Sequence, residues 1–126
     1  MSSRNTHVAE ALQTFFSGFG VPAYAVGAVP NEAELPYIAY QLAVPAFMSG
    51  QPFYAEVFAR KSISLIELNA LVDQIETAIG EGVSIPTGSG AVWIYRGDNF
   101  RQDRQFNADP YYRCAYLNLI IQAPTM

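Results

Sequence analysis

The sequence predicts a single α+β domain, in which an antiparallel or mixed β-sheet carries two helices packed on one face. Two stretches have the apolar spacing of amphipathic helices, and the stretches between and after them are rich in β-branched and aromatic residues. The order is helix, three strands, helix and then at least two strands. With 126 residues the chain is long enough for one hydrophobic core and too short for two, so residues 1–126 are expected to form one domain.

The first helix is expected from His7 to Ser17, with Asn5 or Thr6 as its N-cap. Gly18 and Gly20 end it. Its apolar residues recur at helical spacing and are Val8, Leu12, Phe15 and Phe19.

The second helix is the most strongly indicated element, because Ser64 and Glu67 have the spacing of a capping box. One face of this helix is apolar and consists of Leu65, Leu68, Val72, Ile75 and Ile79. Gly80 and Gly82 provide its C-terminal stop. We expect the apolar face to pack on the sheet.

Strands are predicted in the apolar stretches between prolines, which we expect to flank strands and to avoid their interiors. The predicted strands are Ala23–Val29, Tyr37–Val44, Phe53–Arg60, Ala91–Tyr95 and Tyr111–Ala123. In the third of these, Tyr54, Glu56 and Phe58 alternate with small apolar residues, which predicts two distinct faces. The last strand is apolar on both faces, so both sides of it are expected to be covered.

The composition indicates assembly with other proteins. Charged residues are 14% of the chain and hydrophobic residues 51%, which is a low charge content for an isolated soluble domain. A net charge of −4 argues against nucleic-acid binding through a broad basic face. No apolar run approaches the roughly 20 residues that span a bilayer, so we expect a soluble, intracellular protein without a membrane contact.

No catalytic, metal or cofactor site is predicted. His7 is the single histidine, and we interpret it as a surface residue; Cys114 is the single cysteine, and we interpret it as a small buried hydrophobe. A His7–Cys114 nucleophile pair has no support from the pattern. The glycine-rich stretch Gly80–Gly90 lacks the lysine of a phosphate-binding loop and is interpreted as a flexible turn.

One segment concentrates the arginines, although the protein as a whole is acidic. Residues 96–113 contain four arginines and three aspartates, which gives +1 locally and leaves −5 for the remainder. The candidate interface residues in it are Arg96, Arg101, Asp103, Arg104, Asp109 and Arg113. Arginine is favoured at interfaces, so the segment is either an intersubunit contact or a solvated loop, with an extended loop expected over Gly97–Asp109.

The stretches Leu35–Gln41 and Phe53–Arg60, followed by the Ser64–Ile79 helix, resemble the tail-terminator, or tail-completion, proteins of tailed phages. The resemblance spans most of the chain and rests on patterns of apolar and aromatic residues. It implies an α/β subunit, six copies of which form a ring that caps the tail tube and joins it to the head connector. The long Arg96–Pro110 segment departs from the simplest version of the family, and a related neck or connector subunit is equally compatible with it.

The resemblance implies a structural virion protein, located in the tail or neck and in the host cytoplasm during assembly. Its partners would be copies of itself, the tail tube protein and the head-connector protein, with no cofactor. Six copies would carry −24, and DNA would pass through such an acidic lumen without specific binding.

The alternative from another class is a ligand-binding module whose pocket is lined by aromatic residues, namely Tyr24, Tyr37, Tyr40, Tyr54 and Trp93. An enzyme is the third reading, and the chain offers no convergent acid, base and nucleophile for it.

Overall fold

The computed structural model describes residues 4–43, 49–60, 64–88, 90–104 and 112–125. The helices are α1 (Arg4–Phe16), the short 3-10 helix η1 (Ser17–Phe19) and α2 (Ser64–Ile79). The strands are β1 (Ala23–Ala25), β2 (Tyr37–Tyr40), β3 (Gln51–Arg60), β4 (Val83–Thr87), β5 (Gly90–Arg104) and β6 (Tyr112–Thr125). The predicted α+β class is confirmed, since two helices pack on one face of a six-stranded mixed sheet. Neither helix is long and apolar enough to cross a membrane within these ranges.

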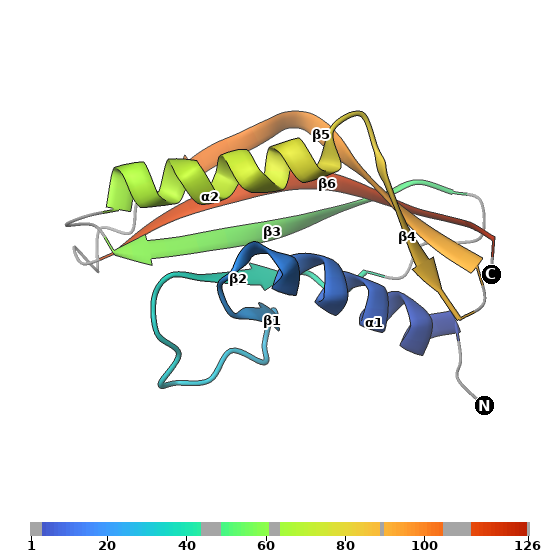
Figure 1. The fold of residues 1–126 in the computed structure, drawn as a ribbon, viewed down its shortest axis with the longest axis horizontal. Coiled ribbons are helices and arrows are strands. Elements are labelled where there is room, and N and C mark those ends of the chain that lie inside the picture. The colour runs from blue at the N-terminus through green and yellow to red at the C-terminus, as the bar shows by residue number, and fades with distance from the viewer. Residues whose placement is uncertain (1–3, 44–48, 61–63, 89, 105–111, 126) are drawn as a thin grey trace.

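The strands form one sheet in the order β1-β2-β3-β6-β5-β4, so β1 and β4 lie at its two edges. β1 runs parallel to β2, and the other neighbouring pairs are antiparallel. Helix α2 lies along β3, β6 and β5, whereas α1 contacts β1 and β2 near one edge and β4 at the other (Figure 1). The sheet therefore curls around the two helices, and α1 spans the distance between its edges.

Helix α1 begins at Arg4, earlier than predicted, so Asn5 and Thr6 lie within the helix and the N-cap assigned to them was wrong. Its core-facing residues recur every fourth position and are fully buried, namely Val8, Leu12 and Phe16. The chain continues into η1 and turns at Gly20, whose φ of 81° lies in the left-handed region that favours glycine.

Helix α2 has the predicted bounds, and four of its five predicted core residues are buried, namely Leu68, Val72, Ile75 and Ile79. The fifth, Leu65, has its side chain outside the described part of the structure. After Ile79 the chain turns through Gly80, whose amide donates to the Glu76 carbonyl at 2.9 Å. A second bond, from the Gly82 amide to the Ile79 carbonyl at 2.8 Å, completes the turn into β4.

Strand β4 was not predicted, because Gly80–Gly90 was interpreted as a flexible turn. It pairs antiparallel with the start of β5, from Val83 opposite Ile94 to Thr87 opposite Gly90. A proline is tolerated in it because β4 lies at the edge of the sheet. The expectation that prolines avoid strand interiors was therefore wrong, and the prolines within strands are Pro52 in β3, Pro86 in β4 and Pro124 in β6.

Strand β5 extends well past the predicted end at Tyr95, and the loop expected over Gly97–Asp109 is a strand as far as Arg104. A bulge interrupts it, because Arg96 pairs with Leu119 whereas Arg101 pairs with Leu117. Residues 97–100 thus lie opposite Asn118 alone.

The side chain of Asn118 closes this bulge. Its Nδ2 donates to the carbonyl oxygen of Asn99 at 2.8 Å and to Oε1 of Gln102 at 3.3 Å. Asn99 has a φ of 51°, which asparagine tolerates better than most residues. At Gly97 the strands approach so closely that a Cβ would lie 3.1 Å from the Asn118 carbonyl oxygen. The contacts that hold residues 97–104 as a strand come from Asn118 on β6, which is distant in sequence, so the local pattern predicted a loop here.

Candidate interaction surface

The two faces of the sheet differ in what covers them. On the inner face, the side chains of β3 and β6 belong to one core with the buried residues of both helices; they include Phe53, Ala55, Val57, Ala59, Ala115, Leu117, Leu119 and Ile121. The residues that alternate with these point to the opposite, outer face. Within the described ranges neither helix packs on that outer face (Figure 1).

The outer face carries a series of aromatic side chains that are partly exposed. They are Tyr24, Tyr37, Tyr54, Phe58, Trp93, Tyr95 and Tyr116. Four of their contacts join neighbouring strands or neighbouring positions: Tyr24–Tyr37 at 5.8 Å, Tyr37–Phe58 at 5.0 Å, Tyr54–Tyr116 at 4.9 Å and Trp93–Tyr95 at 6.2 Å between ring centroids. These aromatic residues extend across the sheet from β1 to β5. We call this set the aromatic face.

Two small residues on this side of the sheet are also buried. Cys114, opposite Phe58 in the register, is 1% exposed, and Ala39, opposite Glu56, is 3% exposed. The Cys114 sulfur lies 3.8 Å from Oε2 of Glu56. Cys114 is thus buried as predicted, and on β6 it alternates with the core-facing Ala115.

Tyr40, predicted as a possible pocket residue, belongs to the core. It is 3% exposed, and its ring stacks on Phe16 with centroids 5.1 Å apart. Its hydroxyl donates to Oε1 of Gln13, and burial raises the pKa of Tyr40 above its usual value of 10.0. Of the five aromatics proposed for a pocket, the other four lie on the aromatic face.

The arginines predicted to form an interface make contacts within the chain. Arg96 forms an ion pair with Glu76 of α2 at 3.1 Å, and both side chains are 42% exposed. Arg101 pairs with Asp103 two residues along the same strand, with Nε and Oδ1 2.8 Å apart. Ion pairs exposed to this degree are worth no more than about 1 kcal/mol, so they leave both arginines available to a partner.

The remaining predicted interface residues are only partly described. The backbones of Arg104 and Arg113 lie on β5 and β6, opposite Cys114 and Ala59 respectively. Asp109 lies outside the described residues. Arg96 and Arg101 pair with acidic residues on different elements, Glu76 on α2 and Asp103 on β5.

Past Ile94, the outer edge of β5 has no neighbouring strand among the described residues. Such an edge can accept a strand from another chain. The bulge and the charged pair Arg101–Asp103 are features that restrict indiscriminate pairing at an edge. A strand of another chain that pairs with this edge would have to accommodate both the bulge and the Arg101–Asp103 pair.

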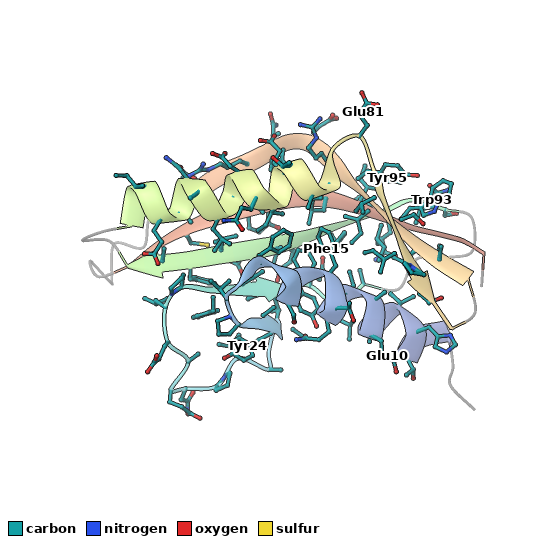
Figure 2. The ribbon with its side chains drawn as sticks, viewed as in Figure 1. Glu10, Phe15, Tyr24, Glu81, Trp93 and Tyr95 are labelled. Atoms are coloured by element: carbon teal, nitrogen blue, oxygen red, sulfur yellow. The ribbon has the colours of Figure 1, made fainter. Side chains whose placement is uncertain are left out.

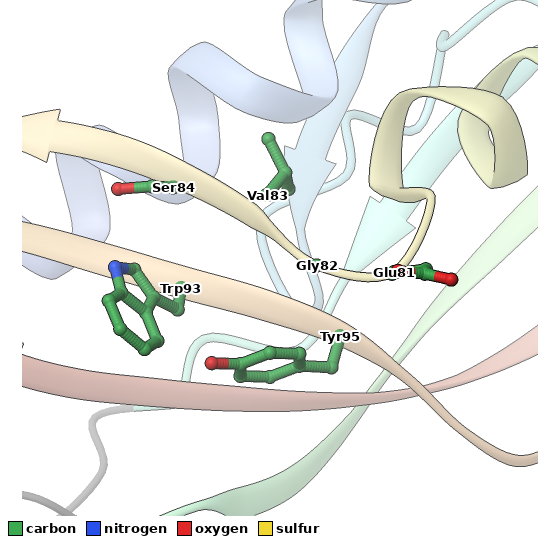
Figure 3. A pocket seen from close by; sticks show the side chains of 6 residues that line it. All are labelled: Glu81, Gly82, Val83, Ser84, Trp93 and Tyr95. Atoms are coloured by element: carbon green, nitrogen blue, oxygen red, sulfur yellow. The ribbon is translucent and has the colours of Figure 1, made fainter.

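A groove of about 240 Å³ lies between β4 and β5, at the β5 end of the aromatic face. It is lined by Glu81, Gly82, Val83, Ser84, Trp93 and Tyr95. Figure 3 shows the Trp93 and Tyr95 rings side by side on β5, and Figure 2 places them near the turn that carries Glu81. Trp93, which is exposed, was among the aromatic residues that the sequence analysis assigned to a possible pocket. The groove itself was not predicted, because its other wall includes the unpredicted strand β4.

The two residues considered for nucleophilic chemistry occupy separate places. The His7 ring lies against Gly88 in the turn between β4 and β5, where a Cβ at Gly88 would be 3.0 Å from Nε2. Cys114 lies on β6 beside Phe58 and Arg104. Across the described part of the chain no group of three or more His, Cys, Asp or Glu side chains is arranged to hold a metal ion.

Comparison with known proteins identifies the fold and nothing finer. No protein-family model matches the sequence, and no curated protein matches it. Among twelve solved chains with significant structural similarity, one aligns over 98% of this chain and 98% of its own, with a TM-score of 0.60 and 9% sequence identity. At this identity the likeness shows a shared fold.

Proposed function

We propose that this protein is a structural ring subunit at the head-proximal end of a phage tail, where it terminates the tail tube and joins it to the head connector. The observation that carries the proposal is the aromatic face, a broad side of the sheet on which seven aromatic side chains are partly exposed and no helix packs within the described ranges. Apolar patches of this kind mark surfaces that contact other proteins. In a ring they would be covered by the neighbouring copy or by the tube.

Two further features support repeated contacts between copies. The edge of β5 past Ile94, which has no neighbouring strand among the described residues, and the aromatic face are different surfaces of one subunit, and a cyclic ring requires two different surfaces that fit each other. The low charge content of 14% also favours burial of surface against other proteins. The resemblance in the sequence supplies the copy number of six and the position at the tail end.

A ligand-binding module is the second candidate, and the groove beside Trp93 is the observation that favours it. Its volume of about 240 Å³ is below the roughly 300–1,000 Å³ of pockets that enclose small molecules. A shallow groove of this size fits one side chain of a partner better than a whole ligand.

The native mass of the protein tests the proposal. We expect native mass spectrometry and light scattering of the full chain, alone and mixed with tail tubes, to show a closed species of defined copy number, and electron microscopy to show rings or capped tubes. A variant with Tyr54 and Tyr116 both changed to Ser removes part of the aromatic face and should shift the population toward species of low copy number. Monomers both alone and on tubes would refute ring formation.

A further inference from the structure

We propose that the groove between β4 and β5 binds the guanidinium group of an arginine presented by a basic segment of a partner protein. The groove lies on the side of the sheet where no helix packs in the described part of the chain, so a partner would be accommodated there. This inference adds a partner contact to the proposed structural role. It does not depend on the number of copies in the ring.

The aromatic rings supply the first part of the recognition. Trp93 and Tyr95 have centroids 6.2 Å apart and ring planes inclined at 78°, so they form two walls of a corner. Trp93 is 39% exposed, which leaves part of its indole open to a visiting group. A cation over an aromatic ring is attracted by the ring quadrupole, most strongly by tryptophan. The planar guanidinium of arginine also stacks on such a ring, whereas a lysine ammonium does not.

One wall of the corner is held in place before binding. A Cβ at Gly82 would lie 2.8 Å from both Cδ1 and Cε1 of Tyr95, so the ring rests directly on the Gly82 backbone. Gly82 also has a φ of 143°, a conformation that side chains rarely adopt. A ring fixed in this way loses little conformational freedom when a partner binds.

The charge beside the groove favours a cation over an anion. Glu81 lies at one end of the groove and is exposed, and in Figure 3 its side chain points away from the Trp93 and Tyr95 rings. It has no ion-pair partner in the described part of the chain, and an exposed side chain changes rotamer within nanoseconds. The Glu81 carboxylate can therefore turn toward a bound guanidinium and accept two hydrogen bonds from its fork.

The size of the groove indicates a side chain and not a free ligand. Its volume is about 240 Å³, and between the two rings and the turn into β4 it is lined by only six residues. Ser84, opposite Trp93 in the strand register, adds a hydroxyl acceptor. Aromatic stacking and a charge-assisted contact at an exposed site are each worth up to about 1 kcal/mol, which gives binding that is useful only as part of a larger interface.

Trp93 is the single tryptophan of the chain, so intrinsic tryptophan fluorescence reports on this groove alone. We would titrate the full chain with a blocked peptide of alternating arginine and alanine, and in parallel with the same peptide containing citrulline, which has the shape of arginine without its charge. We expect a saturable fluorescence change with the arginine peptide. The citrulline peptide should bind about 5- to 10-fold more weakly.

Two matched variants test whether the Glu81 carboxylate is the charge that binds the guanidinium. Glu81→Gln should lower the affinity for the arginine peptide by about 3- to 5-fold. Glu10 is an exposed glutamate on α1, and Glu10→Gln should leave this affinity unchanged. Equal affinity for both peptides, equal loss in both variants, or no saturation by about 10 mM peptide would each overturn the inference. Because the native mass is measured separately, loss of ring formation and loss of arginine binding are distinguishable.

Discussion

The hydroxyl of Tyr40 on β2 donates a hydrogen bond to Oε1 of Gln13 on α1. Nε2 of Gln13 in turn donates to the Ala23 carbonyl oxygen at 3.0 Å, at the start of β1. One side-chain amide thus links α1 to two strands. Together with the stacking of Tyr40 on Phe16, it fixes the helix against this edge of the sheet.

Tyr40→Phe removes this hydrogen bond and keeps the stacked ring. We expect it to lower the free energy of unfolding by about 0.5–1.5 kcal/mol, measured by urea denaturation. Tyr24→Phe is the matched control, because the Tyr24 hydroxyl has no hydrogen-bond partner among the described residues. An equal effect of the two substitutions would show that the bond to Gln13 contributes nothing.

Stability should decrease at alkaline pH. Burial raises the pKa of Tyr40 in the folded state above 10.0, so the unfolded chain loses this proton at lower pH than the folded one. The resulting stabilisation is complete below about pH 10 and is lost as the pH rises through the raised pKa. Urea midpoints between about pH 9 and pH 11 should therefore fall more steeply for the wild type than for Tyr40→Phe. Parallel slopes would contradict this.

The buried face of α2 should dominate the stability of the helix-sheet contact. Leu68→Ala or Ile75→Ala should each cost about 2–5 kcal/mol, because both side chains are at most 2% exposed and their removal leaves a cavity. Ile66→Ala, on the same helix but 84% exposed, should change the denaturant midpoint very little. If Leu68→Ala and Ile66→Ala behaved alike, α2 would not be a core element.

Gly82→Ala should disturb both the backbone and the Tyr95 ring. The new Cβ would lie 2.8 Å from two ring atoms, at a φ of 143°, so we expect a loss of about 1–3 kcal/mol. Thermal unfolding measures the loss. Gly18→Ala is the control, because a Cβ there meets nothing within 4 Å, and it should leave the midpoint unchanged or slightly raised.

Arg101 tests whether the arginine segment acts in assembly. Its ion pair with Asp103 is partly exposed, with the two side chains 27% and 59% exposed, so Arg101→Ala should cost the fold no more than about 1 kcal/mol. If the unpaired edge of β5 contacts a neighbour, the same change combined with Arg104→Ala should prevent the joining of heads and tails in particles, while Arg104→Lys should weaken it. Normal particle yields with both arginines removed would assign Arg101 to a solvated surface.

The elements that the sequence predicted well are those that depend on local pattern. Helix α2 was predicted with its observed bounds, Ser64–Ile79, because its apolar spacing lies within one segment. Strand β4 was missed, since Pro86 and the glycines around it suggest a turn, and only its position at the sheet edge permits a strand. The bulge in β5 depends on Asn118, which is distant in sequence.

The candidate surface was predicted in the same uneven way. The alternation of Tyr54 and Phe58 with small residues identified one face of β3, but not that both helices would leave it uncovered. The arginines were recognised as a group, yet the partner of Arg96 is Glu76 on another element. Which charges pair, and which surface stays open, are set by tertiary packing and leave no local signal.

The position of α1 has a consequence for synthesis on the ribosome. Helix α1 is synthesised before the six strands of the sheet, yet its contacts include β4, which follows α2 in the chain. Until then its apolar stripe of Val8, Leu12 and Phe16 cannot be fully buried, however well the helix itself has formed. Closure of the curled sheet is thus a late event in folding, and a nascent chain stalled before β4 should be bound by chaperones that recognise exposed apolar segments.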